Sequence, residues 1–442
     1  MIRAFLRSPS LRRAAWRAVG VALLAGCSEP TAGPTAVPTV GQVTVTGPVT
    51  LIVGSQVQFT AVVSDRDGVA MTGVPVSWET DNASVATVDP GGRLTGLAGG
   101  AATVRATADG VAGTAAFHVI PPLTVCRPDS QLDAWCRLTD SPTGQTFPSI
   151  SGSRVVWADR RGPANQVIVA LDLTTGQTTV LTPEGEESLL PTIDGDRVIY
   201  ARLPHEGDWQ LLSYDLRTGT ESQFSTIARD VGLGRLALSG NRAAWHTRRN
   251  GNWDIYVYNF ATRQETRLTS DPADQADPAI FGERIVWADR RHGGTWWDVY
   301  LYDFSTGRET RITKSTTMGR GPAISGDRIL WGDIRLGGAF TLYEYDFRRS
   351  DSERDLLTST LLENWIVTAG PYAAWGTRPA IGGFLGTIVA SDFSTGRWVS
   401  VITRLEGWLP AMTQDYLVWE DYRNGNADIY LARIGEIFNP QR

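Results

Sequence analysis

Lysine is almost absent from this chain of 442 residues, since Lys314 is the only one. The positive charge is therefore nearly all arginine, and the formal net charge is −6. Proteins that bind nucleic acid need clustered lysine and arginine side chains to neutralise phosphates. An acidic chain without such clusters has no electrostatic footprint for nucleic acid, and we expect no nucleic-acid partner.

Common catalytic motifs are missing as well. The sequence contains no serine nucleophile elbow, no phosphate-binding loop and no zinc-binding helix motif. Three of its four histidines, His205, His246 and His292, lie in the C-terminal two-thirds at unequal positions within an internal repeat. A metal site would need ligands at equivalent depth in such a repeat. We therefore expect no metal and no cofactor.

The internal repeat is the strongest signal in the sequence. Aromatic residues recur at intervals of 42 to 45 residues, at Trp157, Tyr200, Trp245, Trp287, Trp331, Trp375 and Trp419. A period in the forties is typical of a β-propeller, with one four-stranded blade for each repeat. The pattern covers residues 148–434 and predicts an all-β ring of seven blades.

One copy of the repeat shows how four strands arise. Strands are predicted at 278–281, 284–288, 298–304 and 308–313, because these segments are rich in β-branched and aromatic residues and are separated by glycine turns. A Leu-Thr-like pair ends the fourth strand in six repeats, but seven repeats have the aromatic, so one fourth strand is missing from its own repeat. The missing pair stands upstream, at Leu138-Thr139. Residues 121–147 are therefore predicted to be a connector that contains the outer strand of the blade made by 410–434, at 134–139.

The N-terminus carries a targeting signal. Residues 1–26 contain five arginines followed by an apolar run, 19–24, that is too short to span a bilayer. Leu24-Ala25-Gly26-Cys27 resembles the bacterial lipobox, which implies that Cys27 is lipidated and becomes the mature N-terminus. An ordinary signal peptide with an incidental cysteine is the alternative. We expect export and a lipid anchor in the cell envelope, at the outer membrane or cell surface if the organism is Gram-negative.

Export has two consequences for the mature chain. Removing residues 1–26, which hold no acidic residue, lowers the formal net charge to −11. Cys126 and Cys136 then remain as a pair in an oxidising compartment, and we expect a disulfide between them. Residues 27–41 are rich in proline and threonine and are predicted to form an extended tether.

Residues 42–120 contain short strands with alternating apolar positions, separated by glycine and aspartate turns, which predicts a small β-sandwich. The phrases 74–78, 84–88, 92–96 and 99–104 resemble a group 2 bacterial immunoglobulin-like (Ig-like) domain. In that family Trp78 would pack in the core. The resemblance implies a spacer or adhesive module.

The propeller resembles the TolB-like repeats of bacterial envelope proteins. The matching phrases are Gly-Asp-Arg-Ile-Leu-Trp at 326–331, Trp-x-Asp-x-Arg at 419–423 and Gly-Asn-x-Asp-Ile-Tyr at 251–256 and 425–430. The sixth repeat has lost the Asp-Ile-Tyr phrase. The resemblance indicates architecture more than role, because one fold hosts many functions. The remaining residues, 435–442, are predicted to be a C-terminal tail.

Several charged residues recur with the blades. An aspartate lies two positions after the aromatic and an arginine two positions further on, in the pairs Asp159/Arg161, Asp289/Arg291, Asp333/Arg335 and Asp421/Arg423. A catalytic site needs asymmetry, which residues repeated from blade to blade do not provide. We therefore interpret these pairs as structural.

The residue ten positions before each aromatic, here called the ring position, varies instead. It is Phe147, Leu190, Arg235, Asp277, Gly321, Trp365 or Leu409. Loops on a rigid scaffold commonly carry binding residues. The predicted ligand-binding rim consists of three ring-position residues, Arg235, Asp277 and Trp365. It also includes two residues that lie one position earlier, Arg320 and Trp408. A chance scatter of loop residues is the alternative.

These features predict a monomeric, exported protein whose propeller binds an envelope protein or polysaccharide without catalysis. A carbohydrate-active enzyme, a lyase or glycosidase, is the alternative. Glycosidases generally use two carboxylates that face one pocket. Candidates near the rim are Asp277 and, in adjoining loops, Glu186, Glu187, Asp230 and Asp274.

Overall fold

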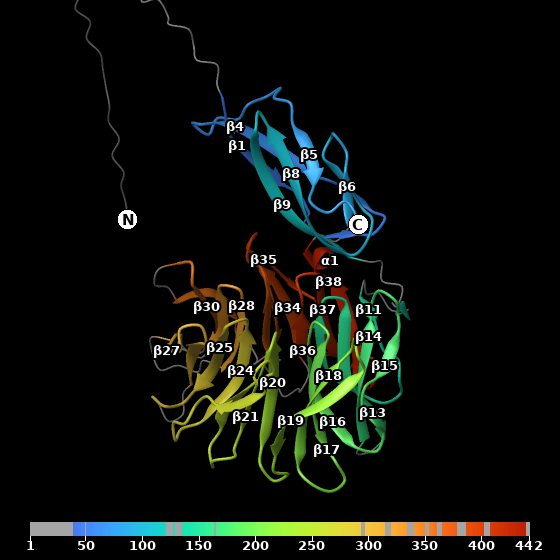
Figure 1. The fold of residues 1–442 in the computed structure, drawn as a ribbon, viewed down its shortest axis with the longest axis vertical. Coiled ribbons are helices and arrows are strands. Elements are labelled where there is room, and N and C mark those ends of the chain that lie inside the picture. The colour runs from blue at the N-terminus through green and yellow to red at the C-terminus, as the bar shows by residue number, and fades with distance from the viewer. Residues whose placement is uncertain are drawn as a thin grey trace, which may run out of the picture.

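A computed structural model shows two units built almost entirely of β-strands (Figure 1). It describes residues 39–48, 50–120, 127–128, 135–162, 165–292, 297–313, 320–333, 340–349, 353–359, 365–377, 386–401 and 407–438. Cys27 and Cys126 lie outside these ranges, as do the predicted signal segment and most of the tether. The all-β fold predicted from the repeats and strand patterns is confirmed.

The N-terminal unit is an Ig-like sandwich. Its sheets have the orders β2-β9-β8-β5, β1-β4 and β3-β7-β6. The strands are β1 (Val40–Thr46), β2 (Thr50–Ile52), β3 (Gln56–Gln58), β4 (Thr60–Asp65), β5 (Ser77–Thr80), β6 (Ala86–Val88), β7 (Arg93–Gly96), β8 (Gly100–Ala108) and β9 (Val111–Ile120). Phe59 and Phe117 meet in the core, with ring centroids 5.8 Å apart, and the half-buried Trp78 packs against the same cluster.

The C-terminal unit is a propeller of four-stranded meanders, numbered here as blades in chain order. Blade 1 has β12 (Gln145–Ser151), β13 (Arg154–Gly162), β14 (Asn165–Asp172) and β15 (Thr178–Val180). Blade 2 has β16 (Glu187–Asp194), β17 (Arg197–Leu203), β18 (Trp209–Asp215) and β19 (Thr220–Ile227). Blade 3 has β20 (Leu233–Ser239), β21 (Arg242–Thr247), β22 (Asp254–Asn259) and β23 (Gln264–Arg267). Blade 4 has β24 (Gln275–Phe281), β25 (Arg284–Asp289), β26 (Asp298–Asp303) and β27 (Arg308–Arg311).

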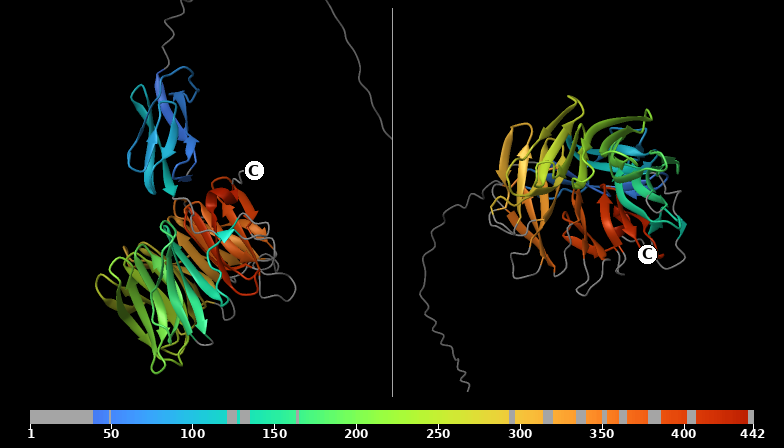
Figure 2. Two further views of the ribbon diagram at one scale, coloured as in Figure 1. Left: turned by 90° about the vertical axis from the view of Figure 1, so that its right-hand side faces the viewer. Right: turned by 90° about the horizontal axis from the view of Figure 1, so that it is seen from below.

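The later blades follow the same plan. Blade 5 has β28 (Arg320–Ser325), β29 (Arg328–Asp333), β30 (Phe340–Asp346) and β31 (Glu353–Ser359). Blade 6 has β32 (Ile366–Ala369), β33 (Tyr372–Thr377), β34 (Thr387–Asp392) and β35 (Arg397–Ser400). Blade 7 has β36 (Gly407–Met412), β37 (Tyr416–Asp421) and β38 (Asp428–Arg433), which continue into β11 (Cys136–Arg137) and β10 (Arg127–Pro128). The view from below shows the blades succeeding one another around a ring (Figure 2).

The recurring aromatics form the cores of the blades. All seven lie on the second strand of their blade and are at most 4 % exposed. Four of the tryptophans also stack on a tyrosine of the third strand, as Trp287 does on Tyr300 at 6.0 Å. Large buried aromatics of this kind dominate core energetics, so the period of the sequence is the period of the hydrophobic core.

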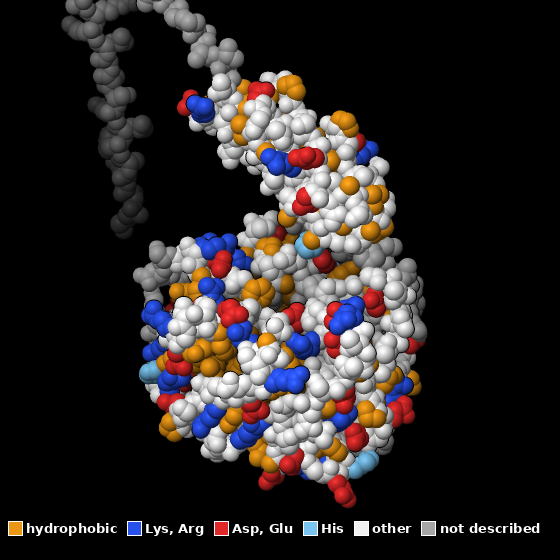
Figure 3. All heavy atoms as spheres, in the orientation of Figure 1, with side chains coloured by type: hydrophobic (Ala, Val, Ile, Leu, Met, Phe, Trp, Pro, Cys, Tyr) orange, Lys and Arg blue, Asp and Glu red, His pale blue; other side chains and the backbone are white. Residues whose placement is uncertain are grey.

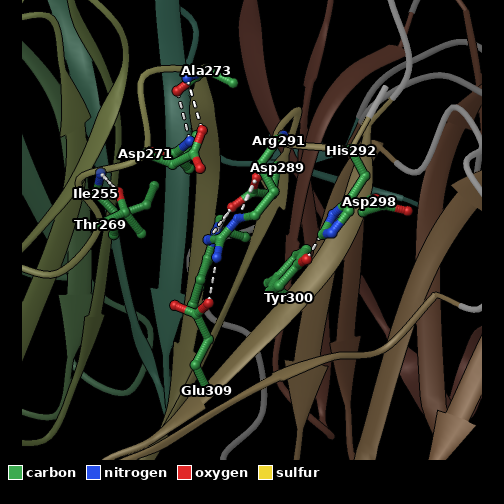
Figure 4. Close-up of polar contacts among 12 residues, drawn as sticks. Ile255, Thr269, Asp271, Ala273, Asp289, Arg291, His292, Asp298, Tyr300 and Glu309 are labelled. Atoms are coloured by element: carbon green, nitrogen blue, oxygen red, sulfur yellow. Dashed lines mark hydrogen bonds and ion pairs between the residues drawn. The ribbon is translucent and has the colours of Figure 1, made fainter. Parts of the chain in front are cut away.

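The repeated aspartate and arginine extend that core into a polar network (Figure 4). In blade 4, Asp289 accepts hydrogen bonds from Trp287 Nε1 at 2.9 Å and from the Arg291 guanidinium at 2.6 Å. The guanidinium lies 4.2 Å from the centroid of Tyr300. Trp419, Asp421, Arg423 and Tyr430 repeat this arrangement in blade 7. These contacts support the structural interpretation of the pairs.

Residues 136–139 add an outer strand to blade 7. β11 pairs antiparallel with β38, and Arg137 forms a 2.7 Å ion pair with the buried Asp428. Ile429 N donates to Thr139 Oγ1 at 2.8 Å. Blade 4 makes the same two contacts within one continuous repeat, through Arg311 with Asp298 and through Thr313 with Val299 N. The role of the added strand in holding the ring closed stays a prediction.

Blades 1 and 7 also pack against each other. One apolar cluster joins Val155, Val167 and Val169 to Val418 and Leu431. Beyond β38 the chain forms a short helix, α1 (Ile434–Phe438), with Ile437 and Phe438 buried and Phe438 stacked on Tyr372. The segment predicted as a tail therefore starts with packed structure. Among the described residues, no helix has the length and apolar character needed to cross a membrane.

Deleting residues 126–139 should lower the melting temperature and promote aggregation, because the backbone edge of β38 would lose its partner. Deleting 42–120 is the matched control, because the sandwich has a core of its own. Equal melting temperatures for the parent and the 126–139 deletion would contradict a closing role for the strand.

Candidate functional site

The innermost strand of most blades is interrupted at the ring position. The pairing register with the second strand shifts between Thr146 and Ser149 in blade 1, and equivalent shifts occur in blades 2, 3, 4, 5 and 7. Such a β-bulge re-aims side chains and is common near functional sites. The variable positions found in the sequence therefore coincide with a repeated break in the ladder.

Five of these bulges share one backbone conformation. Phe147, Leu190, Asp277, Gly321 and Leu409 all have φ between 45° and 58°, in the left-handed region. Each is followed by a proline, at Pro148, Pro191, Pro278, Pro322 and Pro410. Four of the five carry a side chain, and a non-glycine residue held in this region costs about 1–3 kcal/mol. The ring position is thus a conserved geometry within the repeat, although its side chains differ.

Blades 3 and 6 depart from this geometry. Their ring positions are Arg235 and Trp365, neither of which has positive φ or a following proline. The Arg235 guanidinium carbon lies 5.4 Å from the centroid of the Trp365 ring, within the range of a cation–π contact. The two blades that break the repeat therefore bring a cation and an indole together.

A cavity of about 320 Å³ opens beside this pair. It is bounded by the ring positions Phe147, Leu190, Arg235, Trp365 and Leu409, with the adjoining prolines and Leu233. A second cavity of about 170 Å³ also touches Arg235, together with inner residues such as Ile324 and Met412. Arg235 thus borders both of these cavities. We call the 320 Å³ cavity the channel mouth.

Arg235 is a cation without a direct partner. No hydrogen bond or ion pair joins its guanidinium to any residue that the structure describes. Burial lowers the pKa of Arg235, and the charge of the nearby Asp277 opposes that shift. Removing a cation from water is costly unless an anion compensates it. The half-buried guanidinium therefore has donors that a ligand anion could bind.

The other predicted rim residues are placed less centrally. Asp277 lies at its bulge near Arg235, and neither Asp277 nor the half-buried Trp408 is among the residues that bound the channel mouth. Trp408 pairs with Glu420 on β37. Arg320 begins β28, and its side chain is outside the described part of the chain. Cys136 is disulfide-bonded, and because Cys126 is not described, their pairing stays a prediction.

Two polar residues behind the bulges were not singled out as functional from the sequence. The position directly after the blade aromatic is alanine or glycine in five blades, but His246 in blade 3 and Glu420 in blade 7. Asp277 N donates to His246 Nδ1 at 3.2 Å, and Phe147 N donates to Glu420 Oε1 at 2.6 Å. Both side chains are buried and hold the backbone of the next blade at its ring position. The sequence signal for both residues was a polar side chain at a repeat position that is alanine or glycine in the other blades.

His246 also supports the loop before Arg235. A Cβ atom on Gly234 would lie 1.8 Å from His246 Nε2, so only glycine allows this close approach. Burial lowers the pKa of His246, partly opposed by Asp277. A neutral imidazole can accept the Asp277 N–H bond at Nδ1, whereas a protonated one cannot.

The pKa of Glu420 shifts in the opposite direction, upward. Burial raises its pKa to about 7, against the hydrogen bonds from Phe147 N and the Tyr422 hydroxyl, which lower it. The carboxyl group therefore titrates near neutrality while it is bound to a residue of the channel mouth. Charges of both signs are interspersed over the visible face of the propeller, so the field there has no single sign (Figure 3).

The carboxylates suggested for an enzyme mostly have other partners. Glu186 pairs with Arg202 at 3.2 Å, and Asp274 pairs with Arg290 at 3.6 Å and accepts from Trp253 N. None of the residues described around the channel mouth is an aspartate or glutamate. Within the described ranges, no three His, Cys, Asp or Glu side chains gather as a metal site would require.

Comparison with known proteins supports the architecture. Residues 39–119 match the family described as bacterial Ig-like domain (group 2), as the sequence phrases indicated. No curated protein matches the chain significantly.

Solved structures resemble the chain through their fold. Oligogalacturonate lyase from Vibrio parahaemolyticus has 11 % identity and a TM-score of 0.53, over 82 % of this chain and 98 % of that one. The β-propeller domain of the Trilobed protease from Pyrococcus furiosus has 12 % identity and a TM-score of 0.52, over 67 % and 99 %. TolB from Acinetobacter baumannii has 16 % identity and a TM-score of 0.43, over 75 % and 79 %. At these identities the likeness establishes a propeller fold and leaves the activity open.

Glu420→Gln should change how stability depends on pH. The fold raises the pKa of Glu420 from its ordinary 4.5 to about 7, so its contribution is complete below pH 4.5 and is lost as the pH rises through 7. Relative to the parent, the variant should gain on the order of 1–3 kcal/mol in free energy of unfolding between pH 5 and 8. Urea denaturation at several pH values measures this difference.

Glu206→Gln, at an exposed turn residue, is the control and should show no such trend. A difference between Glu420→Gln and the parent that stays constant with pH would contradict the assigned environment of the carboxyl group.

Proposed function

We propose that the propeller binds a protein or polysaccharide partner of the cell envelope at its channel mouth, without catalysing a reaction. The observation that carries this proposal is Arg235, a cation with no direct partner among the described residues, held beside Trp365 in an otherwise apolar cavity. A ligand with an anionic group could accept hydrogen bonds from this guanidinium.

The asymmetry of the ring supports the same function. In five blades the ring position has a left-handed backbone conformation and precedes a proline, whereas in blades 3 and 6 it has neither feature and carries a long, chemically distinctive side chain. Arginine and tryptophan are the residues that most often dominate binding energy. Arg235 lies on β20 and Trp365 directly precedes β32. Side chains held by strands lose less conformational entropy when a ligand binds than side chains on flexible loops do.

A lyase or glycosidase on the same scaffold is the alternative. The lyase from Vibrio parahaemolyticus shows that a chain of this fold can be an enzyme. A carboxylate pair of the kind used by glycosidases is not found among the described residues of the channel mouth. This weighs against a glycosidase at the channel mouth, and cleavage of a polysaccharide by the purified protein would overturn the binding function.

The location follows from the N-terminal signal. A lipobox-like Cys27, an extended tether and an Ig-like spacer would hold the propeller away from the membrane surface. We propose that the protein is an exported lipoprotein that acts as a monomer, with the disulfide of Cys136 formed after export.

Trp365→Ala and Arg235→Gln should each reduce capture of a partner from envelope extract by at least about tenfold, because truncating a hot-spot residue costs 2 kcal/mol or more. Trp408→Ala is the matched control, since that tryptophan is outside the channel mouth, and it should capture normally. Quantitative pull-down with circular dichroism of each variant provides the measurement. Undiminished capture by both channel-mouth variants would place the site elsewhere.

Cys27→Ser should release the protein from membranes into the soluble fraction, because lipidation requires the thiol. Fractionation of cells that express either form, with a high-salt wash, measures the distribution. A mutant that still pellets with membranes after the wash would show that the anchor is not the lipid on Cys27.

A further inference from the structure

We propose that the channel mouth takes an apolar group that carries a single carboxylate, and that the C-terminal residue of a partner protein supplies it. This inference rests on the proposed function, since it names the ligand chemistry of the same site. It follows from three properties of the cavity: its cation, its lining and its volume.

The cation selects a planar anion. A guanidinium binds a carboxylate through two parallel hydrogen bonds, which are stronger than those between neutral groups. Trp365 lies beside the Arg235 guanidinium in a cation–π contact, which leaves the hydrogen-bond donors of the guanidinium open to a ligand. Asp277 is the nearby acid, but it forms no ion pair with Arg235, so the donors remain available.

The side chains of the lining favour an apolar group. Around the channel mouth, the described residues that have polar side chains are Ser149, Thr192 and Arg235, whereas the others are mainly proline, leucine, alanine and aromatic residues. A sugar ring would find few side-chain partners for its hydroxyl groups in this lining. Each buried polar group left unpaired costs about 1–3 kcal/mol. An aliphatic or aromatic side chain has no such cost and gains from burial.

The shape favours the end of a chain. A volume of about 320 Å³ lies at the lower limit of small-molecule sites, which span roughly 300–1,000 Å³. Arg235 lines both this cavity and the second one, so its guanidinium is within reach of a ligand that fills the channel mouth. A C-terminal residue can present its carboxylate there with one chain leaving the cavity. An internal aspartate or glutamate would require two chain segments to pass through the same opening.

The test uses the full-length protein and three synthetic probes. A hexapeptide of five glycines and a final phenylalanine is prepared with a free C-terminal carboxylate and as the C-terminal amide, and trigalacturonate represents an acidic saccharide. Isothermal titration calorimetry measures binding to the parent, Arg235→Gln, Trp365→Ala and the control Trp408→Ala. We expect the acid to bind the parent and Trp408→Ala at least about tenfold more tightly than the amide, the gain expected from hydrogen bonds to a charged group. Arg235→Gln should abolish this preference.

Equal binding of acid and amide, or a preference that survives Arg235→Gln, would overturn the inference. Trigalacturonate that binds through Arg235 while the peptide does not would assign the channel mouth to a saccharide and also overturn it, with the proposed function intact. If no probe binds, the C-terminal assignment fails. In that case the pull-down with Trp365→Ala separates this failure from a failure of the proposed function.

Discussion

The ring depends on a bulge in the innermost strand of its blades. At this point the ladder to the second strand breaks, and in five blades the backbone enters the left-handed region before a proline. Non-glycine residues there store about 1–3 kcal/mol of strain each. The surrounding sheets must over-determine that conformation, which they do through the buried aromatics and the Trp-Asp-Arg-Tyr stacks on either side.

The proposed binding site lies where the left-handed conformation is absent. Arg235 and Trp365 occupy the ring positions of blades 3 and 6 without the left-handed conformation, and they are the largest polar and aromatic side chains of the channel mouth. His246 and Glu420, which replace alanine or glycine behind the bulges, bind the backbone of the next blade. The departures from the repeat therefore either line the channel mouth, as Arg235 and Trp365 do, or bind the backbone of a ring position, as His246 and Glu420 do.

The sequence allowed the architecture to be predicted because a period of about 44 residues directly reports the spacing of the blade cores. It also identified the ring position, since variability beside constant residues is visible in a single chain. It could not reveal that Arg235 and Trp365 meet, because 130 residues separate them and only the curvature of the ring brings them together. Trp408 looked as promising as Trp365 in the sequence, because both are tryptophans at variable positions. It lies outside the cavity, because it precedes the bulge and is still paired with Glu420 on the second strand. The role of Glu420 depends on burial, which one glutamate in a charged chain does not disclose.

The central claim is that Arg235 is a ready carboxylate receptor inside an apolar cavity. A crystal structure of the protein grown with N-acetyl-phenylalanine tests it most directly. The account predicts that the ligand carboxylate lies about 2.7–2.9 Å from the Arg235 guanidinium, the range of charge-assisted bonds, with its phenyl ring among Phe147, Leu190 and Leu409. A guanidinium bound to Asp277, with the ligand elsewhere or absent, would contradict the account.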